Sequence, residues 1–192
     1  MKNLLKSAAF AATILAASVS PVAVQAQTLP PAVIIIVNMD QVFNASAAGK
    51  QAQAELKSKV DAMQARANTL RTQFGAEEEA LAKSQPAPTN TAARPAWEAK
   101  VRDFQSRQQT AQTELSNREK EFQASRSYVL KQITDASNPI ISTLMRERGA
   151  SIAMPEGATL QHAASIDVTN DLVARLDKAL PRVSTTAPAG AK

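Results

Sequence analysis

Residues 56–81 read LKSKVDAMQARANTLRTQFGAEEEAL, and their pattern decides the fold. Apolar side chains recur there at alternating spacings of four and three residues, interrupted only where Glu77 takes an apolar position. This heptad repeat allows one helix to pack along another. The repeat positions are Leu56, Val60, Met63, Ala67, Leu70, Phe74, Glu77 and Leu81. The sequence therefore predicts a long helix that has a helical partner.

A second heptad pattern follows a proline-bearing break. Residues 84–95 contain Pro86, Pro88 and Pro95 among small polar residues, so they cannot be helical throughout. The alternating spacing then resumes at Trp97, Val101, Phe104, Gln108, Ala111, Leu115, Arg118, Phe122, Ser125 and Val129. Two such helices joined by a short loop predict an antiparallel coiled-coil hairpin arm over residues 50–138, with its tip loop at about 84–95.

The repeat positions of this arm include several polar residues. Polar side chains at such positions cost stability, so we expect an arm that bends. Gly75, in mid-helix, is either a flexing point or a tolerated surface glycine. Four arm aromatics occupy repeat positions, and we assign them to packing between the helices rather than to ligand contact. They are Phe74, Trp97, Phe104 and Phe122, whereas Tyr128 lies outside the repeat.

The composition favours helix and excludes several kinds of site. The 192 residues are 44% hydrophobic, but only 4% are aromatic and five are glycine, which is unlike a β-sandwich or a glycine-rich nucleotide fold. The chain has no cysteine, and its one histidine, His162, leaves no metal or triad constellation. The acidic run Glu77–Glu79 cannot converge on one ion, because adjacent helical residues point around the helix. We therefore expect no enzyme activity, no catalytic residue, no cofactor and no metal ligand.

The first 26 residues predict a secretory signal peptide. Lys2 and Lys6 precede an apolar run at 8–19, and the small-residue sequence Val24-Gln25-Ala26 follows. The alternative, a membrane anchor, needs about 20 apolar residues and is less consistent with this short run. Cleavage after Ala26 removes two lysines and leaves 20 basic and 17 acidic residues, a net charge of +3. We expect an exported periplasmic protein, a compartment that the lack of cysteine fits.

Residues 27–49 and 139–182 predict a small body of strands and helices. Ala32–Val37 is a continuous, mostly β-branched run, which favours a strand covered on both faces. Asn38–Ser46 is expected to form a short helical turn that Gly49 punctuates. The fold class is thus mainly α with a small β body.

The second half of this body is expected to contain a hairpin and a last helix. Pro139 predicts a kink or restart of the second arm helix, and Gly149 predicts its end. Ala150–Met154 and Ala158–Ala163 predict two strands around the turn Pro155-Glu156-Gly157, with His162 at the surface or a barrel rim. Thr169 is expected to cap a helix that ends at Pro181 and has Leu172, Val173, Leu176, Ala179 and Leu180 on one face. The tail at 183–192 is small and polar, so we expect disorder.

A body of this size is marginal as an independent core, and its strands leave unpaired edges. We therefore expect self-association in which the strands of several chains complete a closed sheet, a β-barrel. These features leave the number of chains open.

Two motifs near the ends of the body carry a family resemblance. The first is Val37–Asn44, VNMDQVFN, followed by Ser46–Lys50, SAAGK, and Leu56. The second comprises Pro139-Ile140, Gly149 before a strand, and Ile166–Thr169, IDVT. Together they resemble the Skp/OmpH family of periplasmic chaperones. The resemblance implies a homotrimer, in which three helical arms project from a shared β-barrel body around a cavity. It also implies an ATP-independent holdase that binds unfolded outer-membrane proteins and prevents their aggregation before membrane insertion.

Other partners are less consistent with the sequence. The pI of about 9.7 suggests nucleic acid, but acids are interspersed with the bases along the arm, so we expect no nucleic-acid partner. The basic balance attracts anionic lipid head groups, and we expect at most a weak contact with a membrane surface. The alternative function is a periplasmic coiled-coil adaptor or spacer that binds one specific folded partner.

Overall fold

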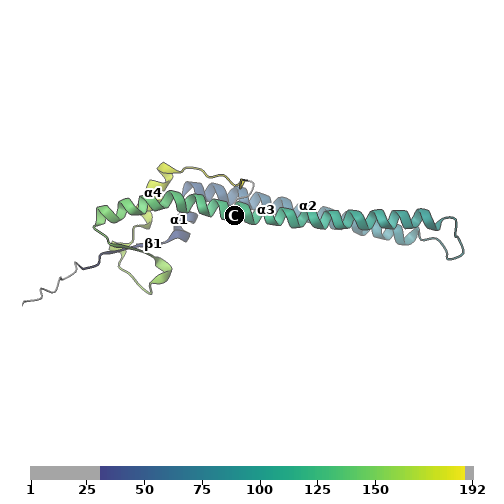
Figure 1. The fold of residues 1–192 in the computed structure, drawn as a ribbon, viewed down its shortest axis with the longest axis horizontal. Helices are drawn as coiled ribbons and strands as arrows, with labels where there is room; N and C mark the ends of the chain where they lie inside the picture. Colours follow the sequence, from purple (N-terminus) through teal and green to yellow (C-terminus); the bar gives the residue numbers. More distant parts are fainter. Residues whose placement is uncertain (1–30, 189–192) are drawn as a thin grey trace, which may run out of the picture. The chain divides into compact units, whose positions relative to one another are not determined.

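The computed structural model describes residues 31–188, which are mainly helical with two short strands (Figure 1). In chain order its elements are β1 (Ile34–Val37), α1 (Met39–Ala45), α2 (Ala47–Lys83), α3 (Arg94–Arg148), β2 (Ile152–Pro155), the 3-10 turns η1 (Glu156–Ala158) and η2 (Ala164–Ile166), and α4 (Thr169–Ala179). The predicted mainly helical class is confirmed. The predicted signal peptide at 1–26 lies outside the described residues.

The two heptad segments form α2 and α3, which lie side by side (Figure 1). With 37 and 55 residues, they are about 55 and 80 Å long at 1.5 Å per residue. Residue numbers rise along α2 while those of its partners fall along α3, as in the pairs Arg66 with Glu114 and Glu77 with Arg107. No helix of the described part combines the length and apolar character of a membrane span.

The hydrophobic core lies where β1, α1 and α4 pack against the first turns of α2 and the second half of α3 (Figure 1). Each fully buried Leu or Ile side chain there contributes about 1.5–3 kcal/mol. Its buried members are Ile35, Val37, Val42, Ala48, Ala52, Val129, Ile133, Leu144, Val168, Leu172, Leu176 and Val183. Three consecutive residues of β1 are buried, as expected of a strand covered on both faces.

The described sheet has two strands, and they are parallel. β1 pairs with β2 in the register Ile34 to Ile152 through Val37 to Pro155, so their connection is the helical crossover through α1, α2 and α3. The predicted hairpin is therefore wrong. Residues 156–158 form η1, and no strand forms over 158–163, because the hydrogen-bonding partner of β2 is β1 rather than the segment that follows.

Gly49 does not punctuate the chain after α1. It lies buried in the first turn of α2. Ser46 caps this helix, and its hydroxyl accepts a hydrogen bond from the Gly49 amide at 3.1 Å. A Cβ added at Gly49 would lie 1.7 Å from the Phe43 carbonyl oxygen. Close approach of the two helices, rather than a break, therefore requires glycine here.

Of the kink or restart expected at Pro139, the restart does not occur, because α3 continues through this residue to Arg148, and the kink stays a prediction. The end at Gly149 is as predicted, since this residue takes the left-handed conformation, with φ of 62°. Thr169 is the first residue of α4 rather than its cap: its hydroxyl is directed to the Asn38 amide, and Val168 precedes the helix.

Residues 183–192 were expected to be disordered, but the structure places residues 183–185 against α2 and α3. Val183 and Thr185 are buried, and the Ser184 amide donates to the side chain of Gln132 at 3.0 Å. The small polar composition of this segment suggested disorder. The side chains that hold it in place, those of Gln51, Lys59 and Gln132, lie far away in the sequence, so its composition could not reveal them. Residues 189–192 lie outside the described part.

Candidate functional site

Charged side chains join α2 to α3 along their length. The Arg66 guanidinium donates to both carboxylate oxygens of Glu114, with Nε to Oε1 at 3.1 Å and Nη2 to Oε2 at 2.9 Å. The Arg107 guanidinium spans Glu77 across the interface, with Nη1 to Oε2 at 2.7 Å, and Asp103 on its own helix. Such paired geometry fixes the register of the two helices more than it stabilises them, because these ion pairs are partly exposed.

These contacts explain how the helix pair accommodates polar residues at its repeat positions. The hydrogen bonds from Arg107 lower the pKa of Glu77, so its carboxylate is ionised at neutral pH. The buried hydroxyl of Ser125 accepts from the Lys59 ammonium at 2.9 Å. Gln108 and Arg118 lie at the exposed surface. Glu77 and Ser125, the two polar repeat positions that are not exposed, therefore each have a hydrogen-bond partner. The expectation that the arm bends stays a prediction.

Aromatic side chains pack between the two helices, as assigned from the sequence. Phe104 is buried and meets Phe74 edge to face, with ring centroids 5.7 Å apart. The Trp97 indole N–H donates to the Leu81 carbonyl at 3.0 Å, near the loop that joins the helices. Packing between the helices is confirmed for these three aromatics. Phe122 and Tyr128 are half-buried.

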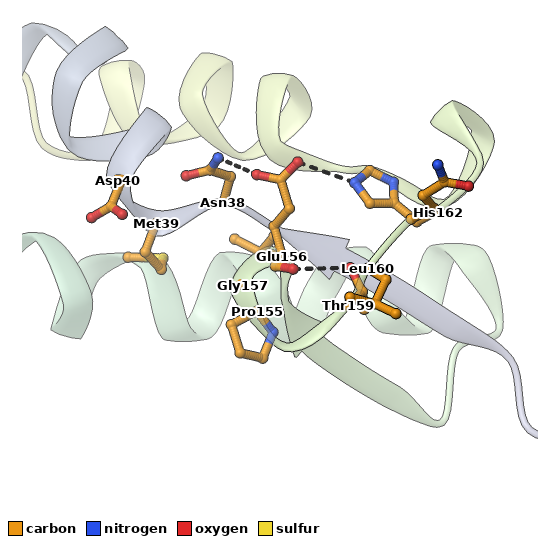
Figure 2. Close-up of a pocket in the computed structure, with 11 residues that line it drawn as sticks. Asn38, Met39, Asp40, Pro155, Glu156, Gly157, Thr159, Leu160 and His162 are labelled. Carbon is orange, nitrogen blue, oxygen red and sulfur yellow. Dashed lines mark hydrogen bonds and ion pairs between the residues drawn. The ribbon is translucent and has the colours of Figure 1, made fainter.

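An open depression of about 820 Å³ lies beside the N-terminus of α1 (Figure 2). The Asn38 side chain accepts from the Gln41 amide at 2.7 Å, which caps α1, and donates to the Glu156 carboxylate. The other oxygen of that carboxylate faces Nε2 of His162 at 3.2 Å. Asn38, Glu156 and His162 thus point toward one another from three separate segments.

Both ring nitrogens of His162 face acceptors, because Nδ1 lies 3.3 Å from the Ala163 carbonyl oxygen. A neutral imidazole has only one N–H to donate, so this environment favours the charged form. The hydrogen bond to Glu156, followed by that to Ala163, accordingly raises the pKa of His162. The prediction that His162 lies in a strand, at the surface or a barrel rim, is wrong for the strand, because His162 lies in a loop. Its side chain is only 15% exposed.

This cluster ties residues 156–162 to the start of α1. The described residues contain no group of three or more potential metal ligands. Sequence reasoning missed the cluster because Asn38 and Glu156 are 118 residues apart. The one local signal was the position of Asn38 directly before a helix, where asparagine is a preferred cap.

Apolar side chains are exposed around the two-stranded sheet. Val33 and Ile152 are each 42% exposed, and Leu160 in the following loop is fully exposed. Within the described residues β2 pairs with β1 alone, so its other edge offers free backbone groups. An edge with apolar neighbours is a surface that favours a protein partner.

Comparison with known proteins finds one matching family model and a solved structure of similar fold. The family model of outer membrane proteins (OmpH-like) matches residues 33–176. Among solved structures, an OmpH-like protein of Caulobacter crescentus, proposed to be an outer membrane chaperone, is similar with a TM-score of 0.68 and 23% sequence identity. The match covers 82% of this chain and 92% of that chain, and at this identity it concerns the fold. A search of the curated proteins finds no match.

Proposed function

Because the chain belongs to the OmpH-like family of outer membrane proteins, we propose that it is a periplasmic holdase chaperone. It binds unfolded outer-membrane proteins without ATP and prevents their aggregation before membrane insertion. The observation that carries this proposal is the family match over residues 33–176, which runs from the residue before β1 into α4. The signal peptide, cleaved after Ala26, delivers the chain to the periplasm.

The α2–α3 pair is the client-holding arm, an antiparallel coiled-coil hairpin. The opposed residue numbering of its cross-helix ion pairs supports this arrangement. Three of its aromatic side chains pack between the helices, so clients contact scattered surface groups, among which Val60 and Leu130 are each more than 40% exposed. Weak, plural contacts of this kind suit many different clients.

Three chains form the working unit, with a β-barrel body that their strands share and a cavity between the three arms. The free edge of β2 and the exposed Val33, Ile152 and Leu160 support self-association at the sheet. The net charge of +3 after signal removal gives a general attraction for acidic clients and a weak one for anionic membrane surfaces.

The test uses the chain that begins at Gln27. Light scattering should give the mass of a trimer, and a monomer would contradict the cavity. A urea-denatured outer-membrane barrel protein is then diluted with one trimer per client and no ATP, and its turbidity is followed. We expect suppression of aggregation. Absence of suppression, together with capture of one folded partner from a periplasmic extract, would favour the adaptor function instead.

A further inference from the structure

The segment Arg182–Thr186, after α4, lies against both α2 and α3 (Figure 1). We name the surface that it covers, formed by Gln51, Glu55, Lys59 and Gln132, the groove. Its side chains alternate in burial: Val183 and Thr185 are each 7% exposed, whereas Arg182, Ser184 and Thr186 face solvent. The chain therefore fills one of its own grooves with a short stretch of alternating pattern.

Long polar side chains of the groove bind the main chain of this segment. The Gln132 amide accepts from the Ser184 N–H at 3.0 Å and donates to the Ser184 carbonyl at 2.8 Å, so it engages both backbone groups of one residue. Gln51 accepts from the Val183 N–H at 3.0 Å, and the Lys59 ammonium donates to the Thr185 carbonyl at 2.6 Å. Nearly every residue type offers these backbone groups.

The side-chain requirements of the groove are modest. Val183 enters the hydrophobic core beside α2 and α3, and the Thr185 hydroxyl donates to Glu55 Oε2 at 2.6 Å. The same hydroxyl lowers the pKa of Glu55, which keeps the carboxylate charged as an acceptor. The groove thus accepts a small apolar residue and, two positions later, a hydroxyl or another small residue.

We propose that the groove formed by Gln51, Glu55, Lys59 and Gln132 is a binding site for extended stretches of unfolded polypeptide, and that Arg182–Thr186 occupies it until a client displaces it. The inference rests on the proposed holdase function. Strands of outer-membrane barrels alternate between apolar and polar residues, so their side chains point alternately to opposite faces, as do the buried Val183 and Thr185 and the exposed Ser184 of the resident segment. Only two side chains of that segment, Val183 and Thr185, are buried, and its hydrogen-bond partners are side chains rather than a strand, so local release is accessible without unfolding the helices.

Tethering gives the resident segment a high effective concentration at the groove. A client stretch must therefore compete with it. An unfolded barrel, which presents many alternating stretches at once, is better able to do so than a folded protein with none exposed. The resident segment in this way selects for unfolded chains.

The test measures binding of a fluorescein-labelled peptide with the sequence of residues 181–188, PRVSTTAP, by anisotropy. The peptide is added to the full chain with Val183→Asp, in which a carboxylate at this buried position expels the resident segment and leaves the groove open. We expect this chain to bind the peptide about ten-fold more tightly than the unchanged chain, in which the tethered segment competes. The peptide PRDSTTAP should not bind.

Two further substitutions in the Val183→Asp chain locate the site. Lys59→Met and Gln132→Ala should each weaken peptide binding about ten-fold by removing a backbone partner. Lys57→Met is the matched control, since its ammonium pairs with Asp61 at the exposed surface, and it should leave binding unchanged. Failure of the peptide to bind a Val183→Asp chain that circular dichroism finds helical would overturn the inference, as would equal binding by the Lys59→Met and Lys57→Met chains.

Hydrogen exchange on the unchanged chain decides the matter if Val183→Asp does not fold. A denatured outer-membrane barrel should speed exchange of the Val183 and Ser184 amides, and unaltered protection of both would overturn the inference. The aggregation assay separates the two proposals. Suppression by the unchanged chain without release of these amides means that the holdase function stands and the groove site fails, whereas absence of suppression removes both.

Discussion

Replacing Gly49 with alanine probes the tight junction between α1 and α2. The added Cβ would lie 1.7 Å from the carbonyl oxygen of Phe43 and 3.0 Å from Ser46 Oγ. Rotation of a side chain cannot relieve the shorter contact, because the Phe43 oxygen belongs to the backbone. The residues on either side, Val42, Ser46 and Ala48, are fully buried, so a shift of one helix disturbs the core.

The magnitude follows from two opposing effects. Alanine in a helix is favoured over glycine by about 1 kcal/mol. Overpacking typically costs about 1–3 kcal/mol and costs more when the backbone must move, as it must here. We therefore expect Gly49→Ala to lower the free energy of unfolding by about 2 kcal/mol or more. Gly75→Ala is the matched control: nothing lies within 4 Å of its added Cβ, and we expect it to raise the free energy of unfolding by about 1 kcal/mol.

Urea unfolding followed by circular dichroism measures both variants, at one fixed protein concentration because self-association contributes to stability. Equal stabilities of the Gly49→Ala and Gly75→Ala chains would refute the close-contact argument. The control has a second use. If Gly75 is a flexing point of the arm, Gly75→Ala also reduces aggregation suppression, whereas a tolerated surface glycine leaves it unchanged.

Three further outcomes are expected. Phe104→Ala should destabilise the helix pair by about 3 kcal/mol, through lost burial and the lost edge-to-face contact with Phe74; unchanged amide exchange in α2 and α3 would contradict this. Ser137→Ala should raise the free energy of unfolding by about 1 kcal/mol, because the buried Ser137 hydroxyl has no hydrogen-bond partner among residues 31–188, and a lower urea midpoint would refute it. His162→Gln should destabilise the chain most in acid: the folded-state pKa of His162 is raised above its ordinary 6.5, so its contribution is full below that value and is lost as pH rises through the raised pKa. The urea midpoints of the unchanged and His162→Gln chains are compared at about pH 5.5 and about pH 8.5, and a loss of stability on substitution that is larger at the higher pH would contradict the argument.

Local periodicity explains which elements the sequence predicted. The heptad spacing from Leu56 to Leu81 requires only neighbouring turns of one helix, and α2 covers all of it. Gly149 ends α3 through its own backbone conformation, which is again a local property. The β-branched run before Asn38 formed β1 for the same reason. The candidate cluster of Asn38, Glu156 and His162 was not predictable in this way, because it exists only once β1 and β2 pair across the helical crossover.

Pro139 illustrates where local reasoning about helix ends fails, because the restart that it could have caused does not occur. A proline inside a helix removes one backbone hydrogen bond and costs about 3 kcal/mol, which favours an interruption. Yet Ile133 and Leu144, on either side of it, are fully buried in the core that β1, α1 and α4 form. Each contributes about 1.5–3 kcal/mol by its burial, so a restart that misplaced both would cost more than the proline does. Helix boundaries are therefore set by local signals only where no core spans them, and α3 continues because its contacts on both sides of Pro139 belong to one core.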